Sequence, residues 1–296
     1  MSKVQAKRPK PVSPRVITQQ KIDKRVAAGD GQGVREEYVP WIKVRSFPSR
    51  GTSHLVPGVN IQRVHHLLSN AEFHYHVILE HDKSIIDIRE QYPLFPQAEI
   101  QSIATSLNIR PPVYPGTQVP LVMTTDFLIT QLTTDGSERL VARSMKYAKE
   151  FHDASPEEKN WILDKLDLER VYWERRNVEW RLVLYERLSQ TRIANLLVLR
   201  SHAKISPLIA NEKNIRKALI AIAAGPTDVM PLKSYLQKLA RFLYMEYVGV
   251  KSLFFHMLWV GALEMDLSAS LISLAEPLSV KVPDVGMADI KVDQHA

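Results

Sequence analysis

Residues 121–146 read LVMTTDFLITQLTTDGSERLVARSMK, and this stretch decides the fold of the first half of the chain. The mostly apolar run at 121–129 predicts a strand that is buried on both faces. Asp135 and Gly136 are typical of a tight turn, and residues 139–146 then predict a second strand in hairpin order. A single acidic residue, Asp126, interrupts the first apolar run.

The carboxylate of Asp126 needs a partner, because an ionised group in a buried strand is strongly destabilising unless it is paired or bound to a metal ion. Ser144 and Lys146 are two residues apart on the second predicted strand, so their side chains share one face. If the hairpin pairs as its turn indicates, this face brings Lys146 near Asp126. A salt bridge would explain both residues, and a catalytic site is the alternative.

The chain on both sides of the hairpin predicts an α/β domain over residues 26–188. Ser69 and Glu72 form a capping box that opens a helix, and capping alone would explain Glu72. Residues 29–33 are glycine-rich but lack the Gly-Lys-Ser/Thr ending of a phosphate-binding loop, so we expect a flexible turn. The other expected features are an irregular segment at 38–68, a strand at 84–89, helices at 97–109 and 161–172, and a strand at 178–184.

From about residue 190 the pattern becomes helical, which predicts a second domain over 189–276. Leucines at 232, 236, 239 and 243 lie on one face of a helix. A second helix begins near Val250 and ends at Gly261, and residues 263–267 alternate like a short strand. This order is typical of a winged helix-turn-helix, although an all-helical unit explains it equally well. Residues 277–296 predict a flexible tail.

Composition and charge narrow the classes of protein. The chain has 296 residues, a formal net charge of +7 and no cysteine, which excludes disulfides, thiolate zinc sites and cysteine nucleophiles. Residues 1–25 hold eight basic side chains and one acidic one, whereas the remaining 271 residues hold 31 of each sign. The basic tail at 1–25 therefore predicts a disordered segment that contacts phosphates, or only a solubilising leader. With no apolar run long enough for a membrane span and no signal peptide, we expect a cytoplasmic protein that binds no membrane.

The order of the polar residues resembles a known nuclease core. A glutamate on a helix, an aspartate on a strand and a lysine on the next strand have the layout of the PD-(D/E)xK, restriction-endonuclease-like proteins. Longer segments resemble the TnsA family, the endonuclease subunits of heteromeric cut-and-paste transposases in the Tn-seven group of bacterial elements. These segments run in family order at 31–41, 63–69, 87–94, 125–128 and 165–173.

The resemblance implies roles for individual residues. Glu72 and Asp126 match the family's metal-binding carboxylates, Lys146 matches its catalytic lysine, and the backbone carbonyl of Met145 would be a further ligand. The implied cofactor is Mg²⁺, for which Mn²⁺ can substitute. Ser144 departs from the pattern, since the wider superfamily has Asp or Glu here and TnsA proteins have Gln. Its hydroxyl could accept a hydrogen bond from water or bind Mg²⁺ weakly, which leaves the metal affinity open.

The resemblance also implies a function. The chain would be a Mg²⁺-dependent DNA endonuclease that cleaves the 5′ ends of a transposable element, while a TnsB-like transposase cuts and joins the 3′ ends. A TnsC-like AAA+ regulator would bind largely through the C-terminal region. Ser144 favours a second hypothesis, a catalytically weak assembly subunit that bridges DNA, transposase and regulator. A third is a stand-alone restriction-like nuclease, which would cleave plain duplex DNA without a partner.

Two further groups of residues allow either a structural or a functional interpretation. Histidines at 65, 66, 74, 76 and 81 lack the spacing of a zinc site, and we expect His65 and His66 to pack or to contact phosphate. Arginines at 170, 175, 176 and 181 alternate with aromatic residues, as on DNA-binding surfaces. Glutamates are interspersed among them, so an ordinary solvated helix face is the favoured interpretation.

Overall fold

Four strands form the central sheet, in the order β3-β4-β5-β6. Their bounds are β3 Ile85–Pro93, β4 Thr124–Leu132, β5 Glu138–Lys146 and β6 Glu179–Leu184. The structure is a computed structural model, and it describes residues 17–44 and 52–283. Strands β3, β4 and β5 are antiparallel, so the predicted hairpin is confirmed, and β6 adds to β5 in parallel. The parallel pair requires a crossover, which helix α5 (Pro156–Glu174) supplies.

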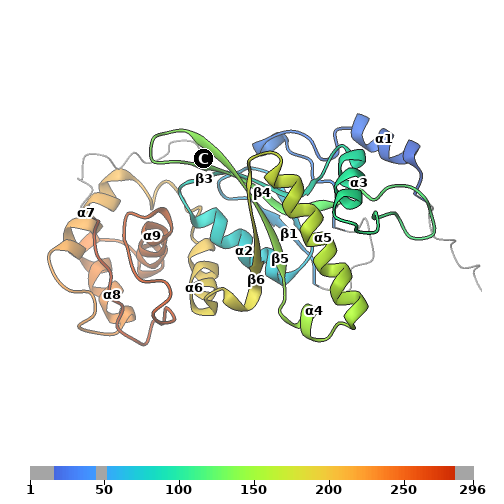
Figure 1. Cartoon of the computed structure of the whole chain (residues 1–296). Helices are drawn as coiled ribbons and strands as arrows, with labels where there is room; N and C mark the ends of the chain where they lie inside the picture. The colour runs from blue at the N-terminus through green and yellow to red at the C-terminus, as the bar shows by residue number, and fades with distance from the viewer. Residues whose placement is uncertain (1–16, 45–51, 284–296) are drawn as a thin grey trace, which may run out of the picture.

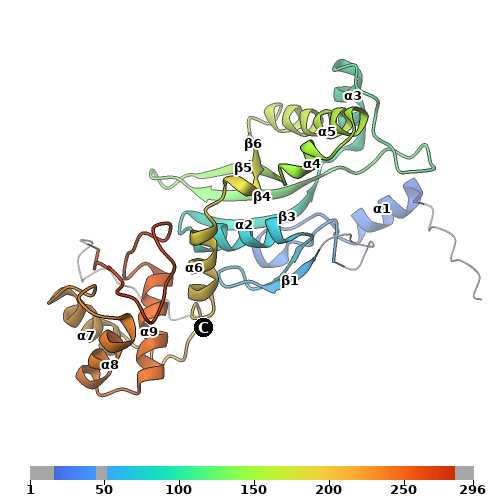
Figure 2. The ribbon, with the colours of Figure 1, turned by 90° about the horizontal axis from the view of Figure 1, so that it is seen from below.

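Helices cover both faces of this sheet. Helix α2 (Asn70–His81) lies on one face, and α3 (Gln97–Ser106) lies beside α5 on the other (Figures 1 and 2). Side chains of β4 alternate between the two layers: Phe127 and Ile129 belong to the core on the α2 side, and Leu128 to the core on the α3 and α5 side. The strand is therefore buried on both faces over residues 127–130, as its apolar run predicts, and its exposed end is at Leu132.

Smaller elements precede α2 and connect β5 to α5. They are α1 (Gln19–Ala27), the 3-10 helix η1 (Arg35–Glu37), β1 (His54–Pro57), β2 (Val64–Leu67) and α4 (Lys149–His152). Strands β1 and β2 pair antiparallel inside the segment expected to be irregular. The boundary of the basic tail was placed too late, because Ile22 is buried on α1 and packs with Trp41. The rest of that predicted tail, residues 1–16, lies outside the described residues.

The glycine-rich turn is packed rather than free. A Cβ atom on Gly31 would lie 2.3 Å from Cγ of Pro93, and the Gly31 N–H donates to the carbonyl of Val39 at 2.6 Å. Glycine is required here because its φ of +79° and this close approach both exclude a side chain. The turn thereby directs the following segment, Tyr38–Trp41, against strand β3.

The C-terminal region is helical. After the short helix η2 (Tyr185–Arg187) it contains α6 (Gln190–Arg200), α7 (Glu212–Ala223), α8 (Leu232–Leu243) and α9 (Tyr247–Val260). The leucine stripe of α8 is buried as expected, and Gly261 ends α9 with a φ of +79°. Winged-helix character is not confirmed. Helix α9 is buried along most of its length, and within the described chain Glu264 forms only an isolated bridge with Lys281 where a wing strand was expected.

The helical core extends beyond its predicted limits at both ends. Leu278 is buried in it, and the hydroxyl of Thr227 donates to the Leu278 carbonyl at 2.7 Å, so residues 277–283 are not a loose tail. At the other end Val77 of α2 belongs to the same core, with α6 lying between the sheet and the remaining helices (Figure 2). Among the described residues, no helix is both long and apolar enough to cross a membrane.

Candidate active site

Glu72 lies in the first turn of α2, where the predicted cap is formed. The Ser69 hydroxyl accepts the N–H of Glu72 at 3.1 Å and donates to its Oε1 at 3.0 Å. The other oxygen, Oε2, accepts from the N–H of Leu68 at 2.9 Å and from the side-chain amide of Gln91 at 3.1 Å. Despite these donors, burial and then the charge of Asp126 raise the pKa of Glu72 to about 8. Capping therefore explains the position of Glu72 but not its proximity to a second carboxylate.

Asp126 lies where strands β4 and β5 separate. Their ladder ends at the pair Phe127 and Arg143, and one residue further along, Oδ2 of Asp126 accepts the backbone N–H of Met145 at 2.6 Å. The side chain of Asp126 thus takes the place of the next backbone hydrogen bond between β4 and β5. Burial raises the pKa of Asp126, although Lys146 and the Met145 N–H oppose that shift.

Lys146 ends β5 beside these carboxylates. Its ammonium donates to the carbonyl of Met145 at 3.2 Å and lies 3.9 Å from Oε2 of Glu150. Burial alone would lower the pKa of Lys146, but the charges of Asp126, Glu150, Glu169 and Glu72 outweigh it and the pKa is raised. The side chain therefore stays an ammonium at neutral pH and donates hydrogen bonds. The structure brings together the three charged residues singled out in the sequence.

Ser144 faces a different partner. Its hydroxyl donates to Oε1 of Glu169 on α5 and accepts from the indole of Trp180 at 3.3 Å. The hydroxyl of Thr125 also donates to Glu169, at 2.6 Å. Burial, followed by the charge of Asp126, raises the pKa of Glu169 to about 7. Glu169 was not singled out in the sequence, where it is one of several acidic residues on a charged helix.

The donor set determines whether a divalent cation fits. Within the described ranges no three His, Cys, Asp or Glu side chains form a metal-binding group. The carboxylates of Glu72 and Asp126 and the carbonyl of Met145 are nonetheless hard oxygen donors, the type that Mg²⁺ prefers. Burial and mutual repulsion raise the pKa of Glu72, and burial raises that of Asp126, so a cation between them would relieve an unfavourable arrangement. By chemistry, these residues fit Mg²⁺ with water completing its shell.

The histidines nearest the site have structural contacts. His65 is 1 % exposed, and its Nδ1 lies 3.0 Å from Oε2 of Glu90. Arg63 binds the same carboxylate, with one terminal nitrogen on each oxygen. His66 accepts the backbone N–H of Val44 at 3.0 Å. His65 therefore packs, as one of the two interpretations predicted, and its Nδ1 is engaged by a buried ion pair.

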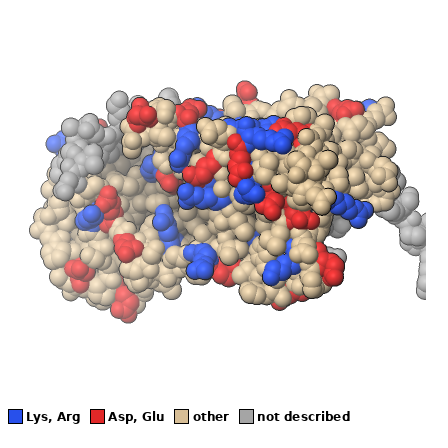
Figure 3. Space-filling view, viewed as in Figure 1, with Lys and Arg blue, Asp and Glu red and all other residues tan. Residues whose placement is uncertain are grey.

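Two of the arginines near the end of α5 are paired with acidic neighbours. Arg170 binds Asp167 and Glu174, and Arg176 binds Glu99 on α3 at 2.7 Å. Basic and acidic side chains alternate across the middle of the face in Figure 3, and neither sign forms an extended patch there. This arrangement agrees with a solvated, ion-paired surface.

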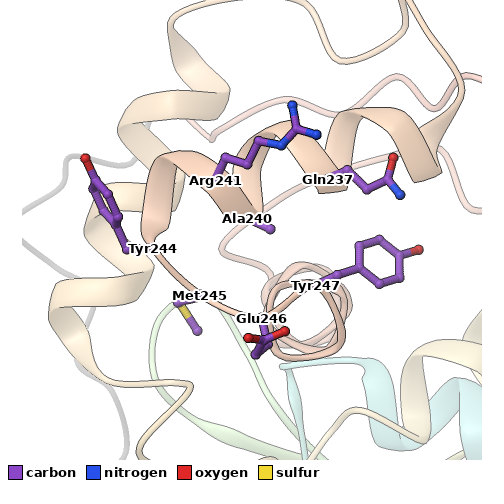
Figure 4. Close-up of a pocket in the computed structure, with 7 residues that line it drawn as sticks. All are labelled: Gln237, Ala240, Arg241, Tyr244, Met245, Glu246 and Tyr247. Carbon is purple, nitrogen blue, oxygen red and sulfur yellow. The ribbon is translucent and has the colours of Figure 1, made fainter.

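A separate hollow of about 660 Å³ lies in the C-terminal region, where α8 turns into α9. Arg241, Tyr244 and Tyr247 are among its lining residues (Figure 4). It shares no residue with the group formed by Glu72, Asp126 and Lys146, so it is not part of the candidate active site.

Two comparisons show which known proteins this chain is similar to. Residues 82–184 match the family described as TnsA-like endonuclease N terminal. The chain is also 39 % identical over 159 residues to the transposon Tn7 transposition protein TnsA of Escherichia coli, which covers 54 % of each protein. The chain thus spans about half the length of this curated relative. Its mixed sheet is consistent with a restriction-endonuclease-like fold. The matched residues 82–184 include Asp126, Ser144 and Lys146, so this part of the chain is similar to the TnsA-like endonuclease N-terminal family.

Proposed function

We propose that this protein is a Mg²⁺-dependent DNA endonuclease that cuts the 5′ ends of a transposable element during cut-and-paste transposition. One observation carries the proposal: two carboxylates that raise each other's electrostatic energy, Glu72 and Asp126, meet the ammonium of Lys146 at the open end of a β-sheet. Buried like charges with perturbed pKa values are typical of functional sites. The match to a TnsA-like endonuclease family supports a nuclease in particular.

Each group would have a defined part in phosphodiester hydrolysis. Glu72, Asp126 and the Met145 carbonyl would hold the cation, which when bound stabilises negative charge on the phosphate and acidifies a water molecule. The Lys146 ammonium would donate to the attacking water or to a phosphate oxygen and so stabilise the charge that develops there. Because its pKa is raised, Lys146 is suited to orientation and charge stabilisation rather than to proton abstraction.

The partners are part of the same proposal. The similar Escherichia coli protein is a transposition protein. By analogy, this chain would act on DNA at the transposon ends together with a TnsB-like transposase that cuts the 3′ strands, and with a TnsC-like AAA+ regulator. The helical C-terminal region lies beyond the matched family segment, and it is the region we propose for contact with the regulator.

Strand-resolved cleavage of a cognate transposon end, with the neighbouring transposase and Mg²⁺ present, tests the proposal. The informative variants are Asp126→Asn, Glu72→Gln and Lys146→Met, each close in size to the native side chain. Asp167→Asn is the matched control, because Asp167 is an exposed acidic residue on α5. We expect the three site variants to lose only the 5′-strand cuts and the control to retain them.

Other outcomes would identify the rival functions. If wild type and site variants all gave 3′-strand cuts alone, the protein would be an assembly subunit on a nuclease fold. Cleavage of plain duplex DNA by the protein alone would instead identify a stand-alone nuclease.

A further inference from the structure

One buried amide lies between the two carboxylates of the candidate active site. Gln91 is on β3, between the cross-strand pairs Glu90–Phe127 and Tyr92–Thr125, and this register places it opposite Asp126. It is 2 % exposed. In the sequence it belongs to the segment 87–94 that resembles the TnsA family, and no local pattern distinguishes it there.

The amide of Gln91 binds Glu72 and faces Asp126. Its Nε2 donates to Oε2 of Glu72 at 3.1 Å. The amide also lies opposite Asp126, and it lowers the pKa of that carboxyl against the effect of burial. Its carbonyl oxygen accepts from the hydroxyl of Thr124 at 3.4 Å, which orients the amide with its nitrogen toward the acids. Since an amide has two N–H donors, one side chain can bind both carboxylates at once.

The backbone at Gln91 is held in an unfavourable conformation. Its φ of +51° lies in the left-handed region, which is unfavourable for a residue other than glycine. Segment Tyr38–Trp41 supports it from both sides: the Tyr38 hydroxyl donates to the carbonyl of Glu90 at 3.0 Å, and the Trp41 N–H donates to that of Gln91 at 3.3 Å. Both aromatic residues are buried. The strain is thus maintained by a packed segment.

A neutral donor suits this position for a physical reason. Lysine or arginine between the carboxylates would pair with them and compete with a metal ion for the same oxygens. An amide fixes the acids without neutralising them, and Oε1 of Glu72 and Oδ2 of Asp126, which each accept one hydrogen bond, retain capacity for another contact. A residue needed only for packing would require neither the left-handed backbone nor two acidic partners.

We propose that Gln91 is a positioning residue that holds Glu72 and Asp126 at the separation needed to bind a divalent cation, and that Tyr38–Trp41 keeps Gln91 in place. This inference rests on the proposed function, because it assigns Gln91 a role in assembling that nuclease site. The role is indirect, since Gln91 acts through the two carboxylates.

Binding of Mn²⁺ to the full-length protein without DNA, followed by electron paramagnetic resonance, tests the inference. The main variant is Gln91→Asn, because asparagine tolerates a left-handed backbone well but its amide is one methylene too short to bridge the acids. We expect its urea unfolding midpoint to equal or exceed that of the wild type, while its affinity for Mn²⁺ falls at least tenfold. Gln131→Asn, at another glutamine of the same sheet, is the matched control and should bind Mn²⁺ as the wild type does.

Two further measurements distinguish positioning from general damage. Tyr38→Phe removes the hydroxyl that binds the Glu90 carbonyl, and we expect a smaller loss of Mn²⁺ affinity, about threefold. Cleavage by Gln91→Asn in the complete transposase reaction should recover when Mn²⁺ is raised to saturation, since its defect is in metal binding.

The outcomes separate this inference from the function on which it rests. If the wild type binds Mn²⁺ and folded Gln91→Asn binds it equally well, the role of Gln91 is wrong and the nuclease proposal stands. If the wild type binds no Mn²⁺ and makes no 5′-strand cuts, both are wrong.

Discussion

Two buried glutamates adjoin Gln91, one next to it in sequence and one hydrogen-bonded to its amide, and their surroundings are opposite. Glu90 is fully buried, yet the Arg63 guanidinium and His65 outweigh the effect of burial and hold its pKa well below the usual range. Glu72 is nearly as buried, but its neighbours are an amide, a hydroxyl, a backbone N–H and another carboxylate, and its pKa rises to about 8. The two carboxylates differ in whether the protein supplies a positive partner.

This difference helps to separate structural from functional acids. Glu90 on β3 is fully paired with Arg63 and with His65 of β2, so its charge requires no added cation. The charges of Glu72 and Asp126 repel each other, and the ammonium of Lys146, which acts on both, is shared with Glu150. A buried acid without full compensation is costly to the fold, so its retention favours a role that needs an added cation.

The largest effect should come from breaking the complete pair. Arg63→Met leaves Glu90 buried without its main counter-charge, and we expect the free energy of unfolding to fall by about 3–5 kcal/mol. Urea denaturation at pH 7 measures it. Arg170→Met is the control, because Arg170 binds two acids at the surface, where such pairs contribute at most about 1 kcal/mol. Equal effects of the two substitutions would show that the Glu90 pair is not special.

A smaller effect of opposite sign is expected at Glu72. Its pKa of about 8 in the folded protein exceeds the value of 4.5 for a free side chain, so the folded state favours the proton. The stability gained from that proton is present below pH 4.5 and is lost as the pH rises to about 8. Glu72→Gln stays neutral, and it should raise the free energy of unfolding by about 2–3 kcal/mol at pH 8.5 and by much less at pH 5.

Urea denaturation of metal-free protein at the two pH values checks this expectation. Repeating the measurement with Mg²⁺ extends the test. A cation bound only by the folded wild type adds about 1.4 kcal/mol to the free energy of unfolding when its concentration is ten times the dissociation constant. Glu72→Gln should gain little from Mg²⁺. A variant that is less stable than the wild type at pH 8.5 would show that Glu72 is a structural acid like Glu90.

The smallest effect is expected at Ser144. Its hydroxyl binds Glu169 rather than Glu72 or Asp126, so Ser144→Ala should lower the free energy of unfolding by about 1 kcal/mol and change Mn²⁺ affinity less than twofold. Urea denaturation and Mn²⁺ titration measure the two quantities. A tenfold loss of affinity would place Ser144 among the metal ligands and would agree with the doubt that its departure from the family pattern raised.

The sequence predicts those parts of the site that depend on local signals. Ser69 and Glu72 are three residues apart, so their cap follows from helix geometry alone. Asp126 stands out because it breaks an apolar strand, and the turn at 133–137 places Lys146 on the neighbouring strand. Helix α8 also follows from its leucine spacing. The winged-helix arrangement that was expected is not confirmed, because periodicity cannot show that α9 is buried along most of its length.

Contacts between distant segments were not predictable in the same way. Glu169 lies 25 residues after Ser144, and no local pattern distinguishes it from the exposed acids of the same helix. The left-handed backbone at Gln91 depends on Tyr38 and Trp41, about 50 residues earlier in the chain. The burial of Leu278 likewise depends on contacts with α8 and with Thr227.

The separation of these parts along the chain has a consequence for how the protein folds. Tyr38, Glu72, Gln91 and Asp126 come from four different segments, and Lys146 lies 20 residues beyond the last of them. Contacts between residues far apart in sequence form slowly, because closing a long loop loses chain entropy before any contact is gained. We therefore expect the β4–β5 hairpin to form early and the two carboxylates to meet among the last steps. A fragment limited to residues 82–184 would lack Glu72, and in a partly folded chain the two carboxylates of the proposed metal site would still be apart.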